Sequence, residues 1–128
     1  MIDYISTAEA PKPVGPYSQA VKINIDVMHA MIITSGQVAI DPKTGKFLHG
    51  DIATQTTQVC ENLKAVLKKG GSDFSHVLKS TVFLADMKDF VPMNTIYEKY
   101  FGKPARSAIG VNELPLGAKV EIEVIAYA

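Results

Sequence analysis

The stretch Val120-Glu121-Ile122-Glu123-Val124-Ile125-Ala126-Tyr127, near the end of the chain, decides the fold because of its alternation. Successive side chains on a strand point to opposite faces, so the apolar residues at every second position from Val120 to Ala126 share one face. The opposite face carries Glu121 and Glu123, followed by an isoleucine and a tyrosine. This period of two predicts a strand whose apolar face must be covered by other elements.

A second strand is expected just upstream, at residues 105–111, and it carries the one arginine of the chain, Arg106. The other twelve cationic residues are lysines. Arginine presents a planar fork that grips a carboxylate at two points, whereas lysine offers a rotating point charge. Ala108 and Gly110 share a face with Arg106, which leaves room for a small anion or for tight packing. A structural ion pair is the alternative interpretation of Arg106.

Two amphipathic helices are expected between the strands. Asp51 is a suitable N-cap for a helix over residues 52–69, which Gly70 and Gly71 end. Asp86 or Asp89 caps a second helix that reaches Phe101. The second helix has an aromatic stripe, which we interpret as core and not as a cofactor site: Phe90, Met93, Tyr97, Tyr100 and Phe101.

Further strands are expected at residues 1–6, 18–25, 28–35 and 78–85, with a continuation of the third at 38–40 beyond a kink at Gly36. Residues 10–17 contain three prolines and a glycine, which predicts an ordered extended loop. The pattern indicates an α+β fold in a single domain, 1–128, with a mixed sheet of about six strands and two helices on one face. Few residues remain for the other sheet face, so we expect another subunit to cover it.

Composition excludes several classes of function. The 128 residues carry a formal net charge of zero, which argues against a broad basic surface for nucleic acid. Cys60 is the one cysteine, so no internal disulfide is expected and a reducing compartment fits. The three histidines are dispersed without metal-ligand spacing, and no glycine-rich phosphate loop is present. Neither a signal-peptide pattern nor an apolar run of about 20 residues occurs, so we expect a cytoplasmic protein without a membrane span.

Taken together, several segments resemble the RidA family, also called the YjgF or L-PSP family. They occur in the family's order and span essentially the whole chain, and the Pro-Ala-Arg-Ser stretch followed by Val-Glu-Ile is quite specific. The segments are Gly15-Pro16-Tyr17, Ile33-Thr34-Ser35-Gly36-Gln37, Pro104-Ala105-Arg106-Ser107, Leu114-Pro115 and Val120-Glu121-Ile122-Glu123.

The resemblance implies a chorismate-mutase-like fold and a homotrimer whose sheets line a central barrel, with ligand clefts between adjacent subunits. It also implies hydrolytic deamination of reactive 2-imino or enamine acids, 2-iminobutanoate and 2-iminopropanoate, to 2-oxo acids and ammonia. Neither a metal nor a cofactor is required. Two other activities stay open: a ribonuclease that inhibits translation, and a regulatory module that binds small carboxylates.

The resemblance also assigns roles to residues. It implies that Arg106 binds the substrate carboxylate, that Glu121 positions the hydrolytic water and that Tyr17 closes the cleft. We therefore expect the guanidinium and the carboxyl group to converge on one small cavity. The substrate-binding positions near the cleft are Ser35, Gly36, Asn94 and Ala108. Many family members carry cysteine where this chain has Ala108, so a role of that thiol in regulation is absent here.

Overall fold

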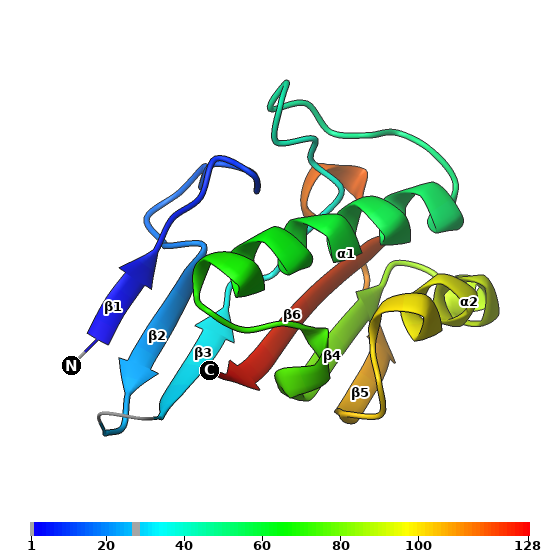
Figure 1. Ribbon diagram of the computed structural model, residues 1–128. Helices are drawn as coiled ribbons and strands as arrows, with labels where there is room; N and C mark the ends of the chain where they lie inside the picture. The colour runs from blue at the N-terminus through cyan, green and yellow to red at the C-terminus, as the bar shows by residue number, and fades with distance from the viewer. Residues whose placement is uncertain (1, 27–28) are drawn as a thin grey trace.

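The computed structural model describes residues 2–26 and 29–128, and six strands form a single mixed sheet in it (Figure 1). The strand order is β1-β2-β3-β6-β4-β5, in which β4 and β5 are parallel and the other neighbours are antiparallel. The alternating stretch at the end of the chain is the β6 strand near the centre. The strands are β1 Ile2–Ile5, β2 Ala20–Asn24, β3 Ala30–Thr34, β4 Val77–Leu84, β5 Ala105–Gly110 and β6 Val120–Tyr127.

Both long helices lie on the same face of this sheet, α1 (Ile52–Lys69) across its middle and α2 (Phe90–Tyr100) towards β5 (Figure 1). Three short 3-10 turns, Phe74–His76, Met87–Asp89 and Pro115–Gly117, connect the elements. The α+β class, the six strands and the one-sided helical layer are as expected from the sequence. No described helix is both long and apolar enough to cross a membrane.

The first helix has the bounds that its end signals predict. A side-chain oxygen of Asp51 accepts a hydrogen bond from the Thr54 amide at 2.8 Å, which satisfies one of the free amides of the first turn. At the other end the Gly70 amide donates to the Val66 carbonyl at 3.1 Å. Gly71 follows with a φ of +85°, a conformation that favours glycine and turns the chain away from the helix axis.

The second helix begins in two steps. Asp86 caps the 3-10 turn by accepting from the Lys88 amide at 2.9 Å, and the α-helix starts after Asp89, whose side chain makes no capping bond. The helix ends at Tyr100, one residue before the predicted Phe101. Of the aromatic stripe, Tyr97 and Phe101 are buried together with Met93, so its interpretation as core is confirmed for these positions.

Some strand boundaries differ from expectation. The predicted continuation at 38–40 is wrong, because this segment forms only isolated bridges, from Gln37 to Ile122 and from Ile40 to Phe47. Strands β2 and β3 are shorter than predicted, whereas β4 keeps its predicted length and begins one residue earlier, at Val77. The expected starts at Met1 and Met28 lie outside the described residues.

The two faces of the sheet differ sharply. On β6, Val120, Ile122, Val124 and Ala126 are all at most 1% exposed beneath the helices. The opposite face, which we call the open face, has no helix over it among the described residues (Figure 1). By strand register it carries apolar side chains that remain exposed: Ile2, Tyr4, Ile33, Ile109 and Tyr127.

Candidate active site

Arg106 is held in a polar and aromatic setting on the helical side of the sheet. It pairs in register with Ser80 of β4, whose own partner is the buried Val124, so it points towards the helical layer. Its Nη1 donates to the side-chain oxygen of Asn94 at 2.6 Å. The guanidinium carbon lies 4.7 Å from the centre of the Tyr97 ring. The fork is therefore fixed in plane and direction by groups from α2.

No carboxylate of the described residues neutralises this guanidinium. Across residues 2–26 and 29–128, the ion pair found is between His29 and Asp26, and Arg106 has no acidic partner within salt-bridge distance. The side chain is nevertheless half-buried. A structural ion pair with one of the described residues is therefore not the reason for the single arginine. A partly desolvated cation with free donors is a ready site for a small anion.

Ala108 lies two residues along the same face and is half-buried against the core. Gly110 continues this row, and a side chain there would meet Met87, because an added Cβ would lie 3.0 Å from the methionine Cγ. The row beside Arg106 therefore consists of small residues next to apolar ones. A short aliphatic ligand group fits this environment better than a charged one.

Glu121 lies on the open face, next to Phe83 of β4, with Gly36 close above it. A Cβ added to Gly36 would come within 2.9 Å of the Glu121 carboxyl carbon, so a larger residue here would displace the carboxyl group from its present position. Burial raises the pKa of Glu121, and the negative charge of Glu123 raises it further. A carboxyl group of raised pKa is suited to accept and return a proton.

The residues predicted around the loop lie near the end of β3. The hydroxyl of Ser35 donates to the Ser18 carbonyl at 2.5 Å. The buried Gln19 donates to the Pro11 carbonyl at 2.8 Å and so anchors the proline-rich loop. Tyr17 extends from this loop and is half exposed, with its hydroxyl accepting from the Val14 amide at 3.4 Å. An exposed tyrosine on an anchored loop is free to close over a neighbouring cleft.

The predicted site residues form two groups on opposite faces of the sheet. Arg106, Asn94 and Ala108 lie on the helical side of β5, whereas Glu121 and Gly36 lie on the open face. The expected convergence of the guanidinium and the carboxyl group does not occur within one chain. The reason is register: Glu121 pairs with Phe83 of β4, and Phe83 pairs with Ile109 of β5. Ile109 lies three residues from Arg106, an odd number, so its side chain points to the opposite face of the sheet.

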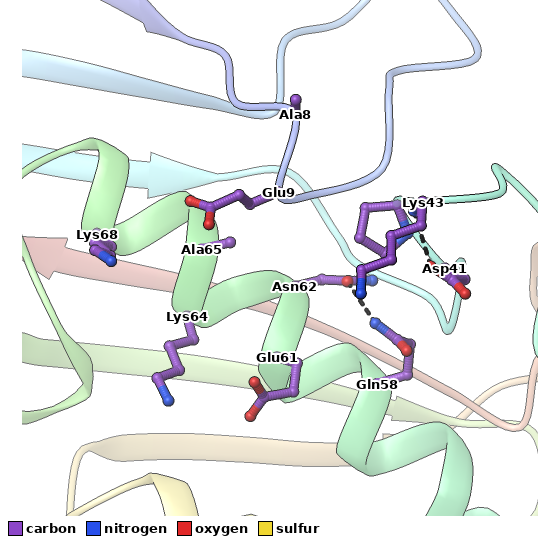
Figure 2. Close-up of a pocket in the computed structure, with 11 residues that line it drawn as sticks. Ala8, Glu9, Asp41, Lys43, Gln58, Glu61, Asn62, Lys64, Ala65 and Lys68 are labelled. Atoms are coloured by element: carbon purple, nitrogen blue, oxygen red, sulfur yellow. Dashed lines mark hydrogen bonds between the residues drawn. The ribbon is translucent and has the colours of Figure 1, made fainter.

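A separate cavity lies away from these residues. Figure 2 shows it on the outer side of α1, with a volume of about 510 Å³. Its most buried polar group, Asn62, donates to the Ile40 carbonyl at 2.9 Å and accepts from Gln58 at 2.8 Å. None of the predicted site residues lines it. The buried amide of Asn62 is therefore satisfied by the chain itself and does not call for a ligand in this cavity.

Three residues near Arg106 were not assigned to the site from the sequence: Ser80, and also Phe90 and Tyr97, which were interpreted as core. Phe90 lies 5.5 Å from the Arg106 guanidinium, and the Tyr97 hydroxyl bonds to the Ser80 hydroxyl at 2.5 Å in the interior. A signal existed, because Phe90, Asn94 and Tyr97 follow at i, i+4 and i+7 and therefore share one helix face. Burial raises the pKa of Tyr97, so Arg106 faces a neutral phenol at neutral pH.

Comparisons with known proteins agree with the motifs. The family model described as Endoribonuclease L-PSP matches residues 7–128. A RutC family protein of Pyrococcus horikoshii is 50% identical over 129 residues, covering 99% of this chain and 98% of the relative. The 2-iminobutanoate/2-iminopropanoate deaminase of Mus musculus is 47% identical over 124 residues, covering 95% of this chain and 88% of the relative.

A solved structure extends the likeness to three dimensions. The crystal structure of E. coli TdcF with bound serine superimposes with a TM-score of 0.87 at 34% identity, covering 98% of each chain. The fold, the motifs and the family model lead to the same assignment: the chain belongs to the Endoribonuclease L-PSP family, which includes the RidA proteins.

Proposed function

We propose that this protein hydrolyses 2-imino acids such as 2-iminobutanoate and 2-iminopropanoate to 2-oxo acids and ammonia, without a cofactor. The observation that carries the proposal is the half-buried guanidinium of Arg106, which is fixed by Asn94 and has no carboxylate partner within the described residues. A substrate carboxylate supplies that partner. The deaminase named among the relatives supports the reaction class.

The reaction needs one water and two proton transfers. Arg106 binds the carboxylate at two points and presents the neighbouring C=N carbon to water. Glu121 takes a proton from the attacking water, so that the oxygen bonds to this carbon and the π electrons move to nitrogen. The nitrogen gains two protons, one from Glu121 and the other from the remaining hydroxyl group. The C–N bond then breaks, ammonia leaves with the bonding electrons, and the hydroxyl oxygen becomes the carbonyl oxygen of the 2-oxo acid. The protonated Glu121 supplies one of these protons, which suits a carboxyl group of raised pKa.

The cleft that performs this reaction combines two copies of the chain. One copy supplies Arg106 from the helical side of β5, and the open face of the next copy supplies Glu121. A homotrimer with the open faces turned to a central barrel covers the exposed apolar side chains of these faces and closes three such clefts. Burial of this apolar surface is the driving force for assembly.

The other predicted residues complete the cleft. Asn94 orients Arg106, and Ala108 contributes its backbone carbonyl and a small side chain beside the substrate's aliphatic group. Ser35 and Gly36 shape the wall around Glu121, where the missing side chain of Gly36 leaves space for the carboxyl group. Tyr17 closes the entrance from its loop.

The experiment couples a threonine dehydratase, which releases the imine, to the purified protein and follows decay of the imine. Arg106→Lys keeps the charge but loses the fork, so we expect kcat/KM to fall about 100-fold while the oligomer persists. Turnover near that of the wild type in this variant would refute the role of Arg106. Wild-type protein that binds 2-oxobutanoate but leaves imine decay unchanged would instead identify a carboxylate-binding module, a second candidate that the same unpaired guanidinium favours.

A further inference from the structure

The orientation of Arg106 depends on a chain of contacts that begins inside the protein. The hydroxyl groups of Ser80 and Tyr97 share a hydrogen bond of 2.5 Å in the interior, where Ser80 is fully buried. The phenol ring that this bond holds lies under the guanidinium of Arg106 at 4.7 Å. Tyr97 also stacks on Phe101, with ring centroids 3.9 Å apart and planes at 4°. The ring is therefore fixed on both of its sides and at its tip.

We propose that Tyr97, anchored by Ser80, is a positioning residue for Arg106, and that it pre-orders the guanidinium for a carboxylate ligand. The identity of the ligand in this inference rests on the proposed function, whereas the contacts between Tyr97 and Arg106 do not depend on it. Tyr97 touches no substrate in this role. It sets the plane of the fork, while Asn94 holds one terminal nitrogen at 2.6 Å and leaves the remaining donors to the ligand.

Physical chemistry gives the reason for such a device. An arginine side chain has several rotatable bonds, and ordering it at the moment of binding opposes affinity. A cation over an aromatic face is attracted by the ring, more strongly when both are withdrawn from water. Tyr97 is only 6% exposed and Arg106 half-buried, so the contact is partly desolvated. Phe90, at 5.5 Å, adds a second ring to the same guanidinium.

The test compares Tyr97→Leu with Tyr100→Leu. Tyr100 belongs to the same helix, but its hydroxyl donates to Glu61 at 2.7 Å and its ring packs against Phe74, with ring centroids 5.6 Å apart. For Tyr97→Leu we expect the dissociation constant of 2-oxobutanoate and the KM for the imine to rise about tenfold, with kcat changed far less. Tyr97→Phe keeps the ring but loses the hydrogen bond to Ser80, so we expect a dissociation constant between those of the wild type and Tyr97→Leu. Tyr100→Leu binds as the wild type does.

A second readout needs no ligand. Arg106 is the one arginine, so its guanidinium 15N signals are unique in the NMR spectrum. In the wild type and in Tyr100→Leu we expect an ordered Nε–H group whose chemical shifts are changed by the ring currents of the aromatic side chains. In Tyr97→Leu we expect a mobile Nε–H group without this change in chemical shift. If Tyr97→Leu does not fold, Phe90→Leu, at a half-buried position, carries the test with a smaller change of the same sign.

Equal Arg106 signals in the wild type and the folded Tyr97→Leu variant overturn the inference, as does an equal loss of affinity in Tyr100→Leu. The proposed function fails separately. Wild-type protein with an ordered, ring-shifted Arg106 signal but no imine hydrolysis upholds the positioning role and refutes the deaminase.

Discussion

Gly36 is the residue at which the backbone comes closest to the proposed base. Its hydrogen occupies space that a methyl group would share with Glu121, since an added Cβ would lie 2.9 Å from the carboxyl carbon and 3.1 Å from Cγ. The neighbour that must yield is a long side chain on the sheet surface and not backbone. A substitution here therefore displaces the carboxyl group while the fold stays intact.

For Gly36→Ala we expect imine hydrolysis to fall about tenfold or more, because a base displaced from its water loses alignment with the reacting carbon. The free energy of unfolding, measured in denaturant, changes little. Gly102→Ala is the matched control, because a Cβ there meets nothing within 4 Å. Full activity of Gly36→Ala, or a comparable loss in Gly102→Ala, contradicts the assignment of Glu121.

At the scale of elements, β6 separates two environments. Its even-numbered side chains are buried beneath the helices, while Glu121 and Glu123 lie next to each other on the open face. Burial is the larger cause of the raised pKa of Glu121, and the charge of Glu123 adds to it. A base must be ionised to accept a proton, so hydrolysis is expected to rise with pH as Glu121 loses its proton.

Glu123→Gln removes the like charge and therefore lowers the pKa of Glu121. We expect the acidic limb of the pH–rate profile to move to lower pH, with the plateau above it unchanged. Glu113→Gln changes an exposed loop carboxylate that is not among the causes of the raised pKa of Glu121, so it leaves the profile in place. A limb that stays fixed in Glu123→Gln, or moves to higher pH, shows that Glu121 is not the titrating base.

The elements themselves were largely predictable, because their signals are local. Helix α1 begins after Asp51 and ends before Gly70, since a capping carboxylate and a pair of glycines mark both ends in the sequence. Residues 38–40 show the opposite case. Their apolar character predicts a strand. In the structure Val38 and Ala39 are buried in the core, but the segment has no continuous neighbouring strand with which to pair. Strand formation depends on a partner that local sequence does not specify.

At the scale of the whole molecule, the relation between the site residues could not be predicted. Alternation assigns Glu121 to one face of β6 and Arg106 to one face of β5. It does not determine whether these two faces lie on the same side of the sheet. The answer depends on β4, which lies between them and pairs Ser80 with both Arg106 and Val124. Long-range register therefore decides that one chain carries the two groups on opposite sides of its sheet.

This geometry makes a strong prediction about mixed oligomers. Arg106→Ala and Glu121→Ala are each expected to be inactive alone. If each cleft takes Arg106 from one copy and Glu121 from the next, an equimolar mixture, unfolded and refolded together, contains intact clefts. Half of the copies carry an intact arginine and half an intact glutamate, so random assembly restores about a quarter of the wild-type activity.

The control mixes Arg106→Ala with the double variant Arg106→Ala/Glu121→Ala, from which no complete cleft can form. Sedimentation establishes that all mixtures assemble to the same mass. A site built within one chain gives no recovery in either mixture, because every chain lacks one of the two groups. Recovery in the first mixture alone therefore requires that the open face of one copy meets the β5 edge of another. A shared cleft needs this arrangement because Arg106 and Glu121 lie on opposite faces of the sheet in each chain.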